Sequence, residues 1–188
     1  NDGSLTFGEV SSQVNQIGNA LLRSGIQFGD CVAVLCPDRS EWVSSFFAVA
    51  KIGGITLAMN TLLKPEEYDY ILGDSRARVL IVHESLLDVI APTFENHKSL
   101  EHVVVIDGSR DASYTTFDDW IVGEVDTLDA ERTHRDDFCS LHYSSGTTGM
   151  PKGILHAHKD YPLIAQLSGV NLFGLTEDDR TFSVAKLF

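Results

Sequence analysis

Two unbroken runs of aliphatic residues limit the folds that this chain can adopt. VLIV occupies residues 79–82 and VVVI occupies residues 103–106. A strand without alternating polar residues is buried on both faces, and such strands belong almost entirely to parallel sheets that helices cover on both sides. The sequence therefore predicts an α/β fold with a largely parallel sheet flanked by helices.

Helical patterns precede and separate these strands. The first helix is predicted to begin after Thr6, because Glu9 stands three residues later with the spacing of a capping box. Gly25 stands where a glycine cap ends a helix. The short apolar segment Cys31–Leu35 then predicts a strand.

A second helix is predicted from Asp38, which has Glu41 three residues later, to the glycine pair at residues 53 and 54. A third is predicted to have Pro65 in its first turn, followed by two glutamates at the positive end of the helix dipole. The aromatic side chains of the second helix are predicted to lie in the core: Trp42, Phe46 and Phe47.

Composition excludes several classes of protein. Fourteen basic against 27 acidic side chains give a formal net charge of −13, which opposes binding to nucleic acid or to an anionic membrane. No apolar stretch approaches the roughly 20 residues of a membrane-spanning helix. We therefore predict a soluble, cytoplasmic protein. Its three cysteines are predicted to be buried, reduced thiols: Cys31, Cys36 and Cys139.

The most informative stretch, LHYSSGTTGMPKG, covers residues 141–153 and follows a predicted strand. Its glycines allow backbone N–H groups to face an oxyanion, its hydroxyls add rotatable donors, and Lys152 adds a positive charge. The run 143–153 is therefore predicted to bind phosphate. It is not a Walker A loop, because Pro151 and Gly153 occupy the places where that motif requires glycine and Ser or Thr.

The order SSGTTGMPKG at residues 144–153 closely resembles the signature loop of the adenylate-forming superfamily, which includes acyl- and aryl-CoA synthetases. Residues 4–9, 29–38 and 48–60 resemble further segments of that family. The resemblance implies that a carboxylate attacks the α-phosphate of ATP to give acyl-AMP, from which CoA then displaces AMP. It implies ATP, Mg²⁺ and CoA as the small molecules involved. The residues implied to bind the ATP phosphates are Ser144, Ser145, Gly146, Thr147, Thr148, Gly149 and Lys152.

The same resemblance implies that residues 1–188 are part of the family's N-terminal AMP-binding domain, cut at both ends. The family's adenine and ribose motifs, acidic Mg²⁺ ligand and C-terminal domain with its catalytic lysine follow the phosphate loop. The catalytic residues are therefore left unassigned, the catalytic lysine is expected outside this chain, and we expect no ligase turnover from these residues alone.

The final segment, DDRTFSVAKLF at residues 178–188, resembles the segment that precedes the carboxylate pocket of benzoate-CoA ligases. It favours benzoate or a related aromatic acid as substrate, with a medium-chain or other aliphatic acid as the alternative. The residues implied to begin one wall of that pocket are Ala185, Lys186, Leu187 and Phe188.

Two other interpretations stay open. His156 and His158 stand two apart on a predicted strand, so they share a face and could start a metal site; with no third ligand at a suitable spacing, we predict structural histidines and no metal. A non-catalytic nucleotide-binding or interaction module could also carry the loop. A reading frame that continues for one or two further domains beyond Phe188 would favour the ligase.

Overall fold

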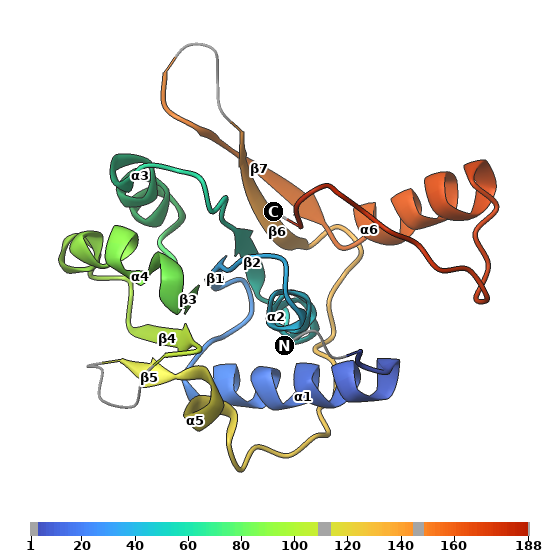
Figure 1. Ribbon diagram of the computed structural model, residues 1–188, viewed down its shortest axis with the longest axis horizontal. Helices are drawn as coiled ribbons and strands as arrows, with labels where there is room; N and C mark the ends of the chain where they lie inside the picture. Colours follow the sequence, from blue (N-terminus) through green and yellow to red (C-terminus); the bar gives the residue numbers. More distant parts are fainter. Residues whose placement is uncertain (1–3, 109–113, 145–148, 188) are drawn as a thin grey trace.

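The computed structural model describes residues 4–108, 114–144 and 149–187. The two aliphatic runs lie in the adjacent strands β3 and β4 of a seven-stranded sheet, whose order is β5-β4-β3-β1-β2-β6-β7 (Figure 1). Neighbouring strands are parallel except for the antiparallel pair β6 and β7. The strands are β1 (Cys31–Leu35), β2 (Ile55–Ala58), β3 (Val79–His83), β4 (His102–Ile106), β5 (Thr115–Thr116), β6 (Phe138–Ser144) and β7 (Lys152–Ala157).

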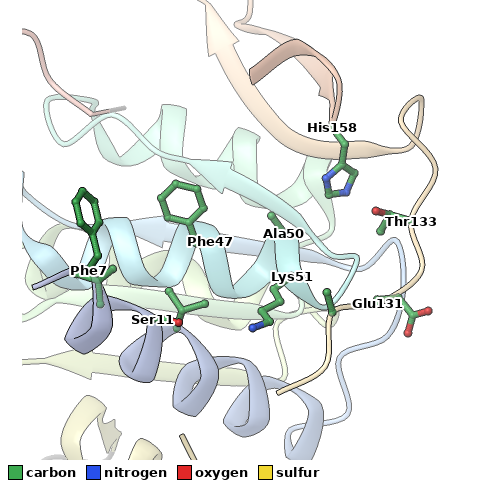
Figure 2. A pocket seen from close by; sticks show the side chains of 11 residues that line it. Phe7, Ser11, Phe47, Ala50, Lys51, Glu131, Thr133 and His158 are labelled. Carbon is green, nitrogen blue, oxygen red and sulfur yellow. The ribbon is translucent and has the colours of Figure 1, made fainter. Parts of the chain in front are cut away.

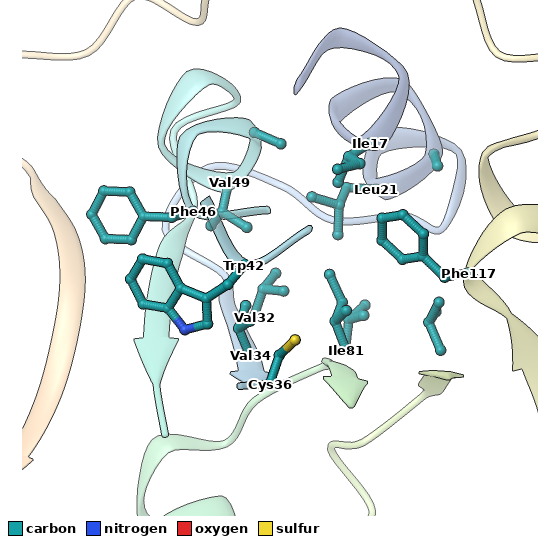
Figure 3. Close-up of a cluster of buried hydrophobic side chains, with 14 of the residues drawn as sticks. Ile17, Leu21, Val32, Val34, Cys36, Trp42, Phe46, Val49, Ile81 and Phe117 are labelled. Carbon is teal, nitrogen blue, oxygen red and sulfur yellow. The ribbon is translucent and has the colours of Figure 1, made fainter. Parts of the chain in front are cut away.

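Both faces of the central strands are buried, as the sequence predicts. Val79 and Ile81 of β3 pack into the cluster formed with α1 (Phe7–Arg23), α2 (Ser40–Lys51) and α5 (Phe117–Ile121), which Figure 3 shows. Leu80 and Val82 pack into the opposite cluster, with α3 (Pro65–Ser75), α4 (Glu84–Ile90) and the 3₁₀ turn Ala91–Asn96. Because successive side chains of a strand point to opposite faces, an uninterrupted aliphatic run fills both clusters.

Short-range sequence signals set the ends of α1 and the start of α3, as predicted. The Glu9 N–H donates to Thr6 Oγ1 at 3.2 Å, and the Thr6 N–H donates to Glu9 Oε2 at 2.7 Å, which completes the capping box of α1. Gly25 follows this helix with φ of +82°, a backbone conformation that glycine adopts without a steric penalty. At α3, Pro65 is in the first turn and the Lys64 N–H donates to Glu67 Oε2.

The start of the second helix differs from the prediction. α2 begins at Ser40, its N-cap Arg39 makes no capping hydrogen bond through its side chain, and Asp38 lies before the helix. Asp38 instead accepts a hydrogen bond from the Leu187 N–H. Asp38 therefore bonds to a backbone donor outside the helix instead of capping it. That donor is 149 residues away, so the local sequence could not have predicted this bond.

Two of the three aromatic residues of α2 are buried, while Phe47 is 55% exposed. Trp42, Phe46 and Val49 lie on the stripe that faces the sheet. Phe47 is the neighbour of Phe46, about 100° further around the helix, so it cannot share that stripe. The prediction that all three aromatic side chains lie in the core was therefore wrong for Phe47.

After β7 the helical segment extends away from the sheet, and the end of the chain then returns toward it (Figure 1). α6 (Asp160–Ile164) follows β7 and passes into the π-helical segment Ala165–Leu172. Several large apolar side chains are exposed along it and the following residues: Leu163, Ile164, Leu167, Val170, Leu172 and Phe173.

Two sequence predictions concern the cysteines and the membrane. Cys31, Cys36 and Cys139 are buried free thiols, as predicted. Burial raises the pKa of Cys31 and of Cys36 to about 12, so these thiols stay protonated and unreactive near neutral pH. Within the described ranges, no helix has the length and apolar character needed to cross a bilayer.

Truncation of Ile81 tests whether the sheet centre limits stability. This side chain is fully buried, so Ile81→Ala is expected to lower the free energy of unfolding by about 2–5 kcal/mol, and Ile81→Val by only about 0.5–1.5 kcal/mol. Chemical denaturation followed by circular dichroism measures both. An alanine variant that costs no more than the valine variant would contradict a close-packed centre at this strand.

Candidate functional site

The predicted phosphate loop begins where β6 ends, at the carboxyl edge of the sheet. β6 runs parallel to β2 and continues to Ser144, beyond its last pair with that strand at Ala58–His142. In open α/β sheets, ligands bind outside the carboxyl ends of the strands. The loop therefore starts at the edge where this class of fold binds its ligands.

An antiparallel pair fixes the two ends of the loop. Tyr143 pairs with Gly153 and Ser144 pairs with Lys152. The side chains of Ser144 and Lys152 are exposed, and Gly149 has φ of +112°, a conformation that side chains disfavour. A hydroxyl, an ammonium group and a glycine turn thus share one short exposed segment, and this combination suits an anion.

The other predicted phosphate-binding residues, Ser145, Gly146, Thr147 and Thr148, lie outside the described residues. Their role stays a prediction. The described residues of the loop supply no carboxylate; its cationic side chain is Lys152.

The predicted substrate segment also lies at the carboxyl edge. The Leu187 N–H donates to Asp38 Oδ1 at 3.0 Å, and Lys186 Nζ lies 3.1 Å from Asp38 Oδ2. Asp38 follows β1, whose carboxyl end is close to that of β2 in the parallel sheet. The hydrogen bond from Leu187 is the main cause that lowers the pKa of Asp38, so this anchor carries a negative charge. Phe188 lies outside the described residues.

A polar cluster on β6 was not anticipated from the sequence. The hydroxyls of Ser140 and Tyr161 are 2.6 Å apart, and His142 Nε2 lies 3.2 Å from Ser140 Oγ and 3.3 Å from the Tyr161 hydroxyl. The His156 ring packs edge-on against His142, with centroids 5.4 Å apart. Alternate polar residues on β6, Ser140 and His142, were the available signal, because residues two apart share a face. The cluster attaches α6 to the sheet.

His156 and His158 do not form the common site that their spacing allowed. β7 ends at Ala157, between the two residues, so the strand repeat does not extend to His158. His158 lines a pocket with residues of α1 and α2, including Phe7, Phe47 and Lys51 (Figure 2). Its Nε2 atom is buried and has no hydrogen-bond partner among the residues that the structure describes. Within the described part of the chain, no three His, Cys, Asp or Glu side chains gather as a metal site would require.

The largely parallel sheet and the exposed loop at its carboxyl edge define an α/β domain with a candidate anion-binding loop. The family described as "AMP-binding enzyme" matches residues 1–188. The chain therefore belongs to the AMP-binding enzyme family, as the signature loop predicted.

Named relatives agree with this assignment. The chain is 38% identical over 187 residues to a benzoate–CoA ligase of Thauera aromatica, and the match covers 99% of this chain and 35% of the relative. It is 34% identical to a 3-hydroxybenzoate–CoA ligase of Aromatoleum sp. (strain CIB), with 98% of this chain and 35% of the relative covered. The chain thus spans about a third of the length of these relatives.

Among solved structures, the chain resembles an anthranilate CoA ligase, AuaEII, in complex with anthranoyl-AMP. The TM-score is 0.96 and the identity 56%, over 99% of this chain and 36% of that protein. The fold prediction, a partial N-terminal domain of the adenylate-forming fold with a largely parallel sheet, is confirmed.

The polar cluster predicts a pH dependence of stability. Burial is the main cause that lowers the pKa of His142 from its ordinary value of 6.5, and the neighbouring His156 adds to it. Between the lowered pKa and 6.5, the unfolded chain binds more protons than the folded chain, so stability is fully present above pH 6.5 and falls as the pH drops through that window. His142→Gln is expected to make the loss between pH 7.5 and pH 5.5 smaller.

Denaturant unfolding at the two pH values measures this loss. The matched control is His134→Gln, because the His134 side chain is 70% exposed and its ion pair with Asp136 lies outside the cluster, so its removal is expected to leave in place the loss that His142 causes. Equal losses in the parent and in His142→Gln would show that His142 does not cause the decline.

Proposed function

We propose that the whole protein is an AMP-forming ligase that joins an aromatic carboxylic acid to CoA. The observation that carries this proposal is the SSGTTGMPKG loop. It connects the antiparallel strands β6 and β7 at the edge of the sheet where folds of this class bind ligands. A carboxylate is a poor electrophile, so activation by ATP precedes attack by the thiol. This chain supplies the part of the site that faces the phosphates.

The chemistry of the loop suits the first half of the reaction. Negative charge grows on the departing pyrophosphate while the carboxylate attacks the α-phosphate. Lys152 and the Ser144 hydroxyl, with Ser145, Thr147 and Thr148, would hold the β- and γ-phosphates in line for that displacement. Fixed donors of this kind need no reorganisation during the step, which is the source of their catalytic effect.

Magnesium would neutralise phosphate charge when bound with ATP. Among the loop residues that the structure describes, Ser144 offers a hydroxyl and Lys152 an ammonium group, and none offers a carboxylate. Mg²⁺ commonly binds through substrate phosphates and water with only one or two carboxylates. The loop therefore fits as a partner of the phosphates, and any carboxylate ligand of the ion would come from another part of the whole protein.

The aromatic class of substrate rests on the relatives together with the final segment. The relatives described above are named as ligases of benzoate and 3-hydroxybenzoate, and the solved structure as a ligase of anthranilate. Each of these acids carries its carboxylate directly on an aromatic ring. In this chain, Ala185, Lys186 and Leu187 would begin the wall of the acid pocket, anchored through Asp38.

Exchange of labelled pyrophosphate into ATP tests the proposal on the full-length protein. We expect exchange that depends on benzoate, a hydroxybenzoate or anthranilate. Lys152→Ala and Thr148→Ala are each expected to lower the rate about 10²–10³-fold, the effect of losing one fixed donor to a developing oxyanion.

Lys159→Ala is the matched control. Lys159 also carries a positive charge, but it bonds to Asp136 at 2.5 Å, away from the loop, so its removal is expected to leave exchange unchanged. Exchange with fatty acids alone would refute the aromatic class. A folded protein that gives no exchange with any acid would refute the ligase.

A further inference from the structure

The last residues of β6 are attached to a helix far away in the sequence. The Tyr143 hydroxyl donates a hydrogen bond to Asp74 Oδ2 at 2.5 Å, across 69 positions of the chain. Asp74 lies in the last turn of α3. A hydrogen bond to a carboxylate is shorter and stronger than one between neutral groups. The start of the loop is therefore held by α3 as well as by the sheet.

The Tyr143 ring also lies against the other end of the loop. A Cβ added at Gly153 would be 3.5 Å from Tyr143 Cζ and 3.0 Å from Leu141 Cδ1. The absent side chain of Gly153 thus leaves the space through which the ring passes toward Asp74. Because Gly153 pairs with Tyr143 and is next to Lys152, one aromatic ring contacts both ends of the predicted phosphate loop.

Two further observations favour a fixed position for this ring. Tyr70, on the same helix as Asp74, packs edge-on against Tyr143 with centroids 6.4 Å apart. Burial and the Asp74 carboxylate both raise the pKa of Tyr143, so its hydroxyl stays protonated and remains a donor throughout the physiological range. An ionised phenol could not donate this bond.

We propose that Tyr143 and Asp74 are positioning residues for adenylation: their hydrogen bond, with the ring of Tyr143 over Gly153, holds the two ends of the phosphate loop in the arrangement that binds ATP. This inference rests on the proposed function. Neither side chain touches the phosphates in this role; both act through Ser144 and Lys152. A misplacement of about 1 Å caused by a residue away from the reacting atoms can cost up to about 10²-fold in rate.

The test compares Tyr143→Phe and Asp74→Asn in the full-length protein. Both variants keep the size of the side chain and weaken or remove the bond. We expect kcat/KM for ATP in pyrophosphate exchange to fall roughly ten- to a hundred-fold. Thioester formation from preformed aryl-AMP and CoA, which does not use the loop's pyrophosphate contacts, is expected to stay within about two-fold of the parent. Tyr70→Phe is the matched control, because it removes a hydroxyl of α3 that is not part of the bond.

Hydrogen exchange at the backbone amides of Ser144 and Lys152 gives a second measurement that needs no activity. The proposal expects faster exchange in Tyr143→Phe and Asp74→Asn than in the parent or Tyr70→Phe. Unchanged amide hydrogen exchange together with an unchanged kcat/KM for ATP would overturn the proposal. An equal fall in both half-reactions would also overturn it, since that result indicates general damage.

The two proposals fail in different ways. A parent protein that does not adenylate any acid refutes the ligase, and amide exchange alone then decides whether the bond holds the loop. If Tyr143→Phe does not fold, Asp74→Asn decides both measurements, because its substitution leaves the ring and its packing in place.

Discussion

Burial of the central strands on both faces is the constraint on which the rest of the structure depends. All of β1 and residues 79–82 of β3 are buried, so each of these side chains must meet a helix layer. A shift of one residue between these strands would exchange the two buried sets of side chains, which pack against different helices. Their parallel register, Val32 with Val79 and Leu35 with Val82, is therefore strongly specified. A fixed register also fixes the edge at which β1, β2 and β6 end together, and that edge carries both segments of the candidate site.

Much of this arrangement can be predicted from the sequence because its causes are local. The aliphatic runs, the Thr6–Glu9 capping box and the proline of α3 each act within a few residues, and all appear in the structure as expected. The loop was recognisable for a similar reason. Its glycines, hydroxyls and lysine are consecutive, so their chemistry can be recognised without knowledge of the fold.

The parts that escaped prediction depend on contacts between distant segments. Asp38 has the local features of a helix cap, yet it binds a backbone N–H 149 residues away. Asp74 and Tyr143 stand 69 residues apart and meet only because β6 lies beside β2 with α3 on that face. The pair His156 and His158 shows the converse: regular spacing suggests a shared face, but the strand ends between them at Ala157. Spacing predicts geometry only as far as the element extends.

The antiparallel direction of β7 decides where the two ends of the candidate loop lie. Between two parallel strands, the chain must return from the carboxyl edge of the sheet to the opposite edge before the next strand begins. This crossover connection takes a dozen or more residues. Under the proposed function, two loop ends at the ligand edge would allow residues on either side of the turn to bind the same phosphates. Pairing Ser144 with Lys152 achieves this with only residues 145–151 between them. Among the strands that the structure describes, the antiparallel pair of β6 and β7 therefore lies where the sheet carries the loop, and the bond between Tyr143 and Asp74 attaches that pair to the helical layer.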